Sequence, residues 1–238
     1  MLPIIYLIVA LIEISGEFLE NFSIIYVAKP LLMPILMIWV YTTTKNKKDV
    51  VFLLLGLFFS WLGDLFLMIR HEFEPPKDKM FFIFGLVAFL IAHLNYIICF
   101  LKDVKGKNKI GFIEAKPSLI MPFIAFIVGL LYFLGDSIQA MKVPVYLYCI
   151  IITLMSIVAL NRKGIVSATS FKLIFIGSLL FIFSDMCIAI SVFKAPFYLS
   201  RVLIMSTYIL AQYLIAKGYN THIASATNLP TNQKLELK

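Results

Sequence analysis

The sequence predicts an all-α fold, a polytopic transmembrane bundle of about eight helices, and three observations support this. Of the 238 residues, 61% are hydrophobic and only 14% are charged, against roughly 45–50% and 25% in an ordinary soluble domain. The mean hydropathy is +0.96. Apolar runs of about 20 residues, the length that crosses a bilayer as a helix, recur along most of the chain. These features exclude a soluble globular protein.

The expected spans follow from the charge clusters and turn residues that separate the apolar runs. They are 2–19, 29–44, 50–70, 80–101, 117–134, 143–160, 171–193 and 197–217. The first run lacks a basic n-region and a clear cleavage site, so we interpret it as a retained helix rather than a signal peptide. The second begins at Lys29-Pro30 and contains Pro34, which a membrane helix tolerates where neighbours bond the freed carbonyl.

We therefore expect residues 1–217 to form a single transmembrane helical domain. Residues 218–238 are short, polar and mixed in charge, a composition typical of a disordered tail.

The net charge of +8 is explained by basic residues in loops rather than by a nucleic-acid site. Of the 21 Lys and Arg, 14 fall in segments 45–48, 102–116 and 162–172 and at the C-terminal end, all on one side of the membrane. The positive-inside rule makes that side cytoplasmic. We expect a multi-pass protein of a bacterial cytoplasmic membrane with both termini cytoplasmic, in contact with membrane lipids, with no nucleic acid and no obligate protein partner.

The cysteines indicate neither a disulfide framework nor a metal site. Cys99, Cys149 and Cys187 all lie inside apolar runs and share no C-x-x-C spacing. Only one of the three histidines, His93, lies within a span, so a membrane-embedded zinc site of three histidines is not expected. We expect no metal and no other cofactor.

Three ionisable residues stand where the membrane disfavours them. Asp64, His93 and Asp185 each have apolar residues on both sides, and a charge at the bilayer centre costs about 2.5–3.5 kcal/mol on insertion scales. Helical spacing places further polar side chains on the same faces or on one face of the last span, so four spans carry polar stripes that should point into the bundle. The other members of these stripes are Ser60, Tyr96, Ser178, Tyr208 and Gln212, and Ser184 directly precedes Asp185.

The two aspartates are expected at the same depth. Asp64 lies six residues before Arg70, and Asp185 lies eight before Phe193, which places both about 9–12 Å inside the non-cytoplasmic boundary. Both carboxyls should therefore line one outward-facing cavity. His93 comes out deeper, about 20 Å from the same boundary.

Each of these polar residues also has a simpler interpretation. A single intramembrane aspartate can be neutral and serve only to bond a neighbouring helix. His93, Tyr208 and Gln212 can likewise be polar side chains used in helix packing. Glycines inside the spans, such as Gly177, leave room for close helix contacts.

Charged residues of the first two spans are expected near the membrane boundary. Glu13, Glu17 and Glu20 share one helix face near the end of a span, which suggests a solvated helix end. Lys29 is expected at the outer boundary, where it either binds a lipid phosphate or reaches the interface with its long side chain.

Five short motifs follow one another along the chain. They are Lys29-Pro30-Leu31, Leu62-Gly63-Asp64, Gly85 with Ala92-His93-Leu94-Asn95-Tyr96, Gly177-Ser178-Leu179-Leu180-Phe181 with Ser184-Asp185, and Tyr208-Ile209-Leu210-Ala211-Gln212-Tyr213-Leu214-Ile215. In this order, and in the second, third, fourth, seventh and eighth spans, they resemble the lysoplasmalogenase-like (YhhN-like) family of eight-helix membrane proteins. The first, fifth and sixth spans show no such match.

The resemblance implies an enzyme, a hydrolase that cleaves the vinyl ether bond of lysoplasmalogens. Its lysophospholipid substrate would yield a fatty aldehyde and glycerophospho-ethanolamine or -choline. A vinyl ether is hydrolysed by acid, because the alkene carbon takes a proton, an oxocarbenium forms, water adds and the hemiacetal collapses. The reaction needs one protonated carboxylic acid and one group that orients water and stabilises positive charge.

On this hypothesis Asp64 is the proton donor and Asp185 holds the water or the oxocarbenium, although the residues leave the reverse assignment open. His93 is the third expected catalytic residue and assists one carboxyl or the collapse of the hemiacetal. The expected substrate-binding residues are Lys29, Ser60, Tyr96, Ser178, Ser184, Tyr208, Gln212 and Arg201.

The alternative hypothesis is a proton-coupled transporter of lipids or small molecules, for which intramembrane acids are ordinary. The chain shows no evident inverted repeat and no helices broken by Gly or Pro in matching halves, both of which mark many transporters. Consumption of a lysolipid without any gradient discriminates between the two hypotheses.

Overall fold

The computed structural model describes residues 1–105 and 110–227. Within these ranges the chain forms nine α-helices and no strand. The helices are α1 (Leu2–Phe18), α2 (Phe22–Thr43), α3 (Val51–Ile69), α4 (Lys77–Val104), α5 (Phe112–Ala115), α6 (Met121–Leu134), α7 (Lys142–Asn161), α8 (Ala168–Phe193) and α9 (Ser200–Thr227).

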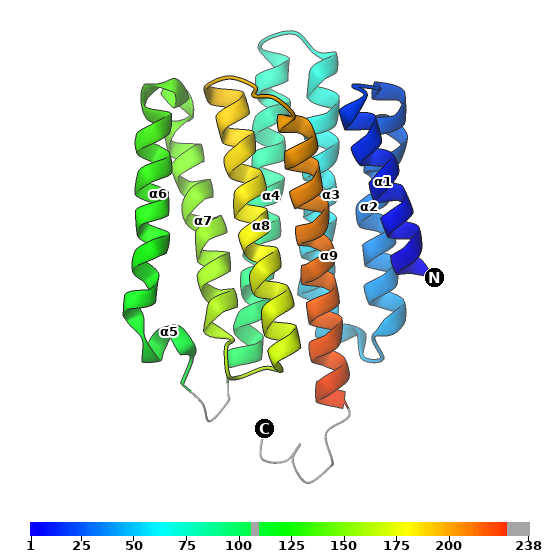
Figure 1. The fold of residues 1–238 in the computed structure, drawn as a ribbon, viewed down its shortest axis with the longest axis vertical. Helices are drawn as coiled ribbons and strands as arrows, with labels where there is room; N and C mark the ends of the chain where they lie inside the picture. The colour runs from blue at the N-terminus through cyan, green and yellow to red at the C-terminus, as the bar shows by residue number, and fades with distance from the viewer. Residues whose placement is uncertain (106–109, 228–238) are drawn as a thin grey trace.

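Eight of these helices are long and run up and down as one bundle, whereas α5 has four residues (Figure 1). Among the described residues, six helical segments are long and apolar enough to cross a membrane, and they contain α2, α3, α4, α6, α7 and α8. The shorter α1 packs against α2 and α9, and α9 packs against α8. The predicted all-α bundle of about eight helices is confirmed.

Two boundaries differ from those expected. α2 begins at Phe22 rather than at Lys29, because the side chain of Asn21 caps it by accepting a hydrogen bond from the Ile24 amide at 3.3 Å. Lys29 therefore lies within a helix and not at its start. α9 continues to Thr227 instead of ending near residue 217, so part of the expected tail is helical. Residues 228–238 of that tail lie outside the described residues.

Pro34 sits inside α2 with its backbone compensated by a neighbouring helix. A proline has no amide hydrogen, so the carbonyl four residues earlier, that of Pro30, loses its helical partner. The indole Nε1 of Trp61 on α3 donates a hydrogen bond to this oxygen at 2.9 Å. Trp61 is therefore the neighbouring side chain that bonds the carbonyl freed by the proline inside this helix.

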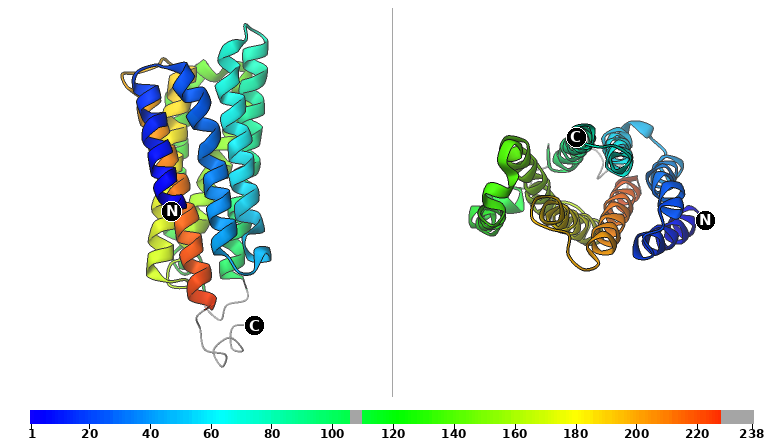
Figure 2. Two further views of the ribbon diagram at one scale, coloured as in Figure 1. Left: turned by 90° about the vertical axis from the view of Figure 1, so that its right-hand side faces the viewer. Right: turned by 90° about the horizontal axis from the view of Figure 1, so that it is seen from above.

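The helices at the two flanks differ in how much they bury. Seen from above, α1 and α2 lie at one flank of the bundle and α6 at the other (Figure 2). α6 buries only Leu130 and Leu134. Phe126 and Leu131 pack against the core while partly buried, and many of its other apolar side chains are exposed, as expected for a helix in contact with lipid.

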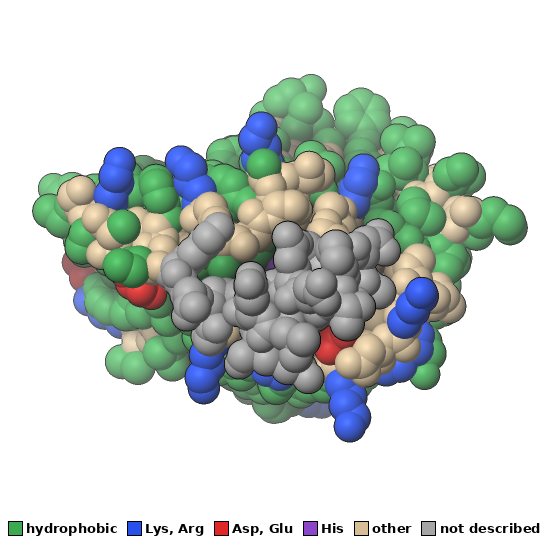
Figure 3. Space-filling model, turned by 90° about the horizontal axis from the view of Figure 1, so that it is seen from below, with side chains coloured by type: hydrophobic (Ala, Val, Ile, Leu, Met, Phe, Trp, Pro, Cys, Tyr) green, Lys and Arg blue, Asp and Glu red, His purple; other side chains and the backbone are tan. Residues whose placement is uncertain are grey.

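The lower end of the bundle in Figure 1 carries many Lys and Arg side chains, which surround the face seen from below (Figure 3). One basic residue of this end is not solvated: Arg162 is fully buried. Its Nε donates to Asp103 at 2.9 Å and its Nη2 to Ser170 at 3.0 Å, while His222 contacts Asp103 at 3.1 Å. This network joins the ends of α4, α7, α8 and α9 opposite the site described below.

Close packing of α8 against α9 depends on Gly177. A β-carbon built at this position would lie 2.9 Å from the carbonyl oxygen of Ala211, and a backbone atom cannot move aside as a side-chain tip can.

We predict that Gly177→Ala destabilises the protein by about 1–3 kcal/mol, the usual cost of overpacking. The matched control is Gly129→Ala on α6, where a β-carbon meets no atom within 4 Å. Thermal unfolding of both purified variants in detergent measures the difference, and equal midpoints would contradict the assignment.

Candidate functional site

A polar cavity of about 760 Å³ lies within the upper half of the bundle. It reaches the upper end, because residues of the α1–α2 and α8–α9 connections line it together with side chains of α1, α2, α3, α4, α8 and α9. The ionisable Asp, Glu, Lys and Arg residues on its wall are Glu17, Glu20, Lys29, Asp64, Arg70, Asp185 and Arg201. Residues far apart in sequence thus form one charged site.

Asp64 projects from α3 and is 5% exposed. The hydroxyl of Tyr208, on α9, donates a hydrogen bond to its Oδ2 at 2.7 Å. The Tyr208 ring is held edge-on by Phe89 and Phe181, with centroid distances of 5.9 and 5.4 Å. One carboxyl oxygen is therefore fixed by a tyrosine that the packing itself orients.

Asp185 projects from α8 into the same cavity and is half-buried. The hydroxyl of Tyr148, on α7, donates a hydrogen bond to its Oδ2. Ser184 also lines the cavity, but its hydroxyl donates to the backbone oxygen of Ile204 at 3.0 Å and so joins α8 to α9. The two aspartates share one cavity, and neither forms an ion pair with a basic side chain in the described part of the chain.

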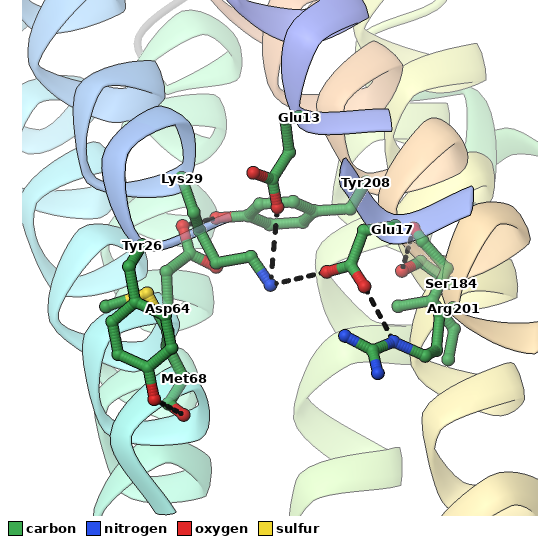
Figure 4. Close-up of polar contacts among 10 residues, drawn as sticks. Glu13, Glu17, Tyr26, Lys29, Asp64, Met68, Ser184, Arg201 and Tyr208 are labelled. Carbon is green, nitrogen blue, oxygen red and sulfur yellow. Dashed lines mark hydrogen bonds and ion pairs between the residues drawn. The ribbon is translucent and has the colours of Figure 1, made fainter. Parts of the chain in front are cut away.

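A cluster of four charged residues, which we call the Glu17 cluster, connects α1, α2 and α9 beside Asp64 (Figure 4). Lys29 Nζ lies 2.9 Å from Glu17 and 3.4 Å from Glu13. Arg201 Nε donates to the second oxygen of Glu17 at 2.7 Å. Lys29 and Arg201 are bridged by one carboxylate, so two positive and two negative side chains lie side by side.

The Glu17 cluster corrects two expectations. Glu13 is fully buried and Glu17 is 5% exposed, so the interpretation of this helix face as a solvated end is wrong for both; only Glu20 is exposed. The Lys29 side chain does not extend freely to the interface either, since it is 13% exposed and paired with both glutamates. Desolvated charges require partners, and the sequence does not show that α1 supplies them to α2.

Five expected site residues lie away from the cavity wall. Tyr96 is fully buried and donates a hydrogen bond to Oε1 of Gln212 at 2.7 Å. His93 is also fully buried, and its ring packs edge-on against Phe181 and Tyr148 at centroid distances of 4.7 and 5.4 Å. The remaining two, both buried serines, are Ser60 and Ser178.

Ser178 shows that sharing a helical face with a site residue is a weak predictor of a place in the site. Its hydroxyl donates to the backbone oxygen of Phe175 at 2.8 Å, within its own helix. Sharing a helical face with Asp185 therefore does not give it a place in the cavity.

Two residues of the site were missed by the sequence reasoning. Tyr148 contacts Asp185, but nothing distinguishes it in sequence from the other tyrosines of an apolar span. Arg70 lines the cavity and forms no side-chain hydrogen bond or ion pair with any residue that the structure describes; its guanidinium lies over the Phe82 ring at 5.2 Å. In the sequence, Arg70 marks only the end of a span.

The fold and the cavity define a polytopic integral membrane protein whose charged site lies between its helices. The chain belongs to the YhhN family, whose model matches residues 24–219, and this confirms the resemblance. It is similar to the protein of Bos taurus named lysoplasmalogenase TMEM86A, with 31% identity over 195 residues, 77% of this chain and 74% of the relative. The Homo sapiens protein of the same name is 28% identical over 192 residues, again 77% and 74% of the two chains. No solved structure matches the chain.

We predict that Glu17→Gln lowers the free energy of unfolding by roughly 3 kcal/mol, because removing the shared carboxylate charge leaves the largely buried Lys29 and the half-exposed Arg201 less compensated. The control is Glu20→Gln, which alters an exposed carboxylate of the same cavity. Thermal unfolding in detergent distinguishes them. If the two variants unfold at the same temperature, the ion pairs do not hold α1 to the bundle.

Proposed function

We propose that this protein hydrolyses the vinyl ether bond of lysoplasmalogens, giving a fatty aldehyde and glycerophospho-ethanolamine or -choline. The observation that carries the proposal is the pair of carboxyls, Asp64 and Asp185, that face one cavity without a basic ion-pair partner. The names of the two relatives, lysoplasmalogenases, support the same chemistry.

Asp64 is the proposed proton donor. It is the more enclosed carboxyl, and Tyr208 occupies only its Oδ2, which leaves Oδ1 to carry the proton. Transfer of that proton to the alkene carbon furthest from the ether oxygen breaks the C=C π bond and leaves an oxocarbenium on the neighbouring carbon. The carboxylate formed on Asp64 then lies close to the positive charge that it has created.

Asp185 stabilises the oxocarbenium and orients the water that attacks it. Water adds to the cationic carbon, and one of its protons passes to a carboxylate of the pair, giving a hemiacetal. Collapse of the hemiacetal breaks its bond to the glycerol oxygen, which takes a proton from the pair and leaves as the alcohol, while the hemiacetal hydroxyl gives its proton to the pair as the aldehyde C=O forms. One water is consumed, and the pair of carboxyls recovers its starting number of protons.

Arg70 and Arg201 are the proposed partners of the head-group phosphate. Both line the cavity near its upper end; Arg70 makes no direct ion pair in the described ranges, although the charge of Asp78 acts on it, and the Arg201 side chain is 39% exposed beside its contact with Glu17. Guanidinium groups suit phosphate because they donate two parallel hydrogen bonds. Lys29, whose charge is balanced by two glutamates, instead keeps the Glu17 cluster in place.

The interior polar residues act through their neighbours in this proposal. Tyr96 and Gln212 bond to each other behind the cavity, and His93 packs behind Tyr148, which in turn holds Asp185. His93 is therefore a positioning residue, and Tyr208, which lines the cavity whereas Gln212 does not, is the residue proposed to position the ether oxygen.

We predict that Asp64→Asn and Asp185→Asn each reduce turnover by about 10²–10⁴-fold, the usual contribution of a general acid or base. The measurement is aldehyde release from a lysoplasmenyl lipid by purified protein in detergent, with the matching acyl lysolipid as a substrate control. Asp136→Asn, which changes a fully exposed side chain, is the matched control and should retain activity.

Near wild-type turnover in both aspartate variants would refute the mechanism. No aldehyde from folded wild-type protein would refute the function itself and favour transport. A parallel sample with chelator should release the same amount of aldehyde.

We further predict that Arg70→Gln raises KM for the lysolipid by about tenfold, or about 1.4 kcal/mol of a charge-assisted contact, with little change in kcat. Lys142→Gln removes a charge at the same end of the bundle but outside the cavity, and its KM should stay at the wild-type value. A fall in kcat at constant KM would place Arg70 elsewhere than at the phosphate.

A further inference from the structure

A second depression, which we call the apolar groove, lies beside the polar cavity between α4, α6, α7 and α8. Its side chains are apolar except for the carboxyl of Asp185 and the hydroxyl of Tyr148 that bonds to it. The groove is narrow, with a volume of about 50 Å³ against about 760 Å³ for the polar cavity. Residues representative of its wall are Leu130, Val145, Cys149, Ile152, Ala189 and Phe193.

The apolar groove borders the polar cavity. Four residues line both, namely Leu67, Phe89, Asp185 and Ile188. Asp185 is the ionisable one among them, so a catalytic carboxyl stands where the charged space meets the apolar space. The two arginines line only the cavity, Asp185 lines both spaces, and the groove extends from Asp185 toward α6.

This order matches the parts of a single-chain ether lipid. Its head group is charged, its vinyl ether follows the glycerol, and its hydrocarbon chain begins at the carbon that must be protonated. We propose that the apolar groove is the subsite for the alkenyl chain, so that the double bond lies between Asp64 and Asp185. The proposal rests on the proposed function and adds to it the position and direction of the bound lipid.

The narrow groove limits the number of hydrocarbon chains that can enter it. The groove has room for one unbranched chain at most, so a second chain attached to the same glycerol would have to lie outside it. The outer wall is formed by α6, which buries little of its own surface. The far end of a long chain can therefore pass α6 and reach the surrounding lipid.

A photo-crosslinking experiment tests the position of the chain without requiring catalysis. The probe is a lysophospholipid with a saturated 1-O-alkyl chain that carries a diazirine, which is not a vinyl ether and so is not cleaved. After irradiation of wild-type protein in detergent, mass spectrometry should find adducts on groove residues of α7 and α8, and an excess of unlabelled lysolipid should suppress them. Adducts confined to the outward faces of the helices would overturn the proposal.

A matched pair of variants tests the same subsite by specificity. Ala189 lines the groove but not the cavity, so Ala189→Phe should reduce kcat/KM for long-chain lysoplasmenyl lipids by about tenfold or more while sparing short-chain ones. Ala125→Phe adds the same ring on the exposed face of α6 and should leave the chain-length profile unchanged.

The outcomes separate this inference from the function on which it rests. Equal chain-length profiles in Ala189→Phe and wild type, with activity retained, would refute the subsite alone. If the wild type cleaves no vinyl ether but the probe still labels the groove, the proposed function fails while the lipid subsite stands. If the variant fails to fold, the crosslinking result on wild-type protein decides.

Discussion

The constraint on which this structure depends is that a polar side chain inside hydrocarbon must find its partner in the protein. Lipid offers no hydrogen bond, so every helix that carries a charge must turn it inward, and helices with complementary groups must become neighbours. The contacts of Tyr208 with Asp64, Tyr148 with Asp185, and Trp61 with the freed carbonyl of Pro30 are each a local solution of this kind. Together they fix the rotation of five helices around one cavity.

The same constraint explains why the polar cavity lies where it does. Glu17 holds Lys29 and Arg201 at once, and this joins the first, second and last long helices around the upper half of the bundle. The buried Arg162–Asp103 pair joins helices in the same way at the opposite end. α6, at one flank, buries little of its surface. The upper half of the bundle thus holds a charged cavity wall, a pair of carboxyls and an adjoining apolar groove. An amphiphilic substrate suits that gradient from charged to apolar.

The sequence predicted the parts of this arrangement that depend on one helix at a time. Span length and hydropathy determine the number of helices, and a 3.6-residue period determines which side chains share a face. Counting residues from the span ends placed Asp64 and Asp185 at one depth, and the structure puts both carboxyls in one cavity. The prediction for Pro34 succeeded for the same reason, because the loss of a helical hydrogen bond is a local event.

What only the tertiary structure decided is which helix supplies each partner. Glu13 and Glu17 look solvated in sequence because their cation is on the next helix, and Arg201 meets Glu17 across 184 positions of the chain. His93, Ser178 and Gln212 look equivalent to the cavity residues, yet a rotation of their helices by part of a turn leaves them in packed interior. Hydropathy and periodicity carry no information on the order and rotation of neighbouring helices. Those are set by side-chain packing between segments distant in the chain, and so the sequence determined the bundle and its acidic stripes, whereas the fold determined the site.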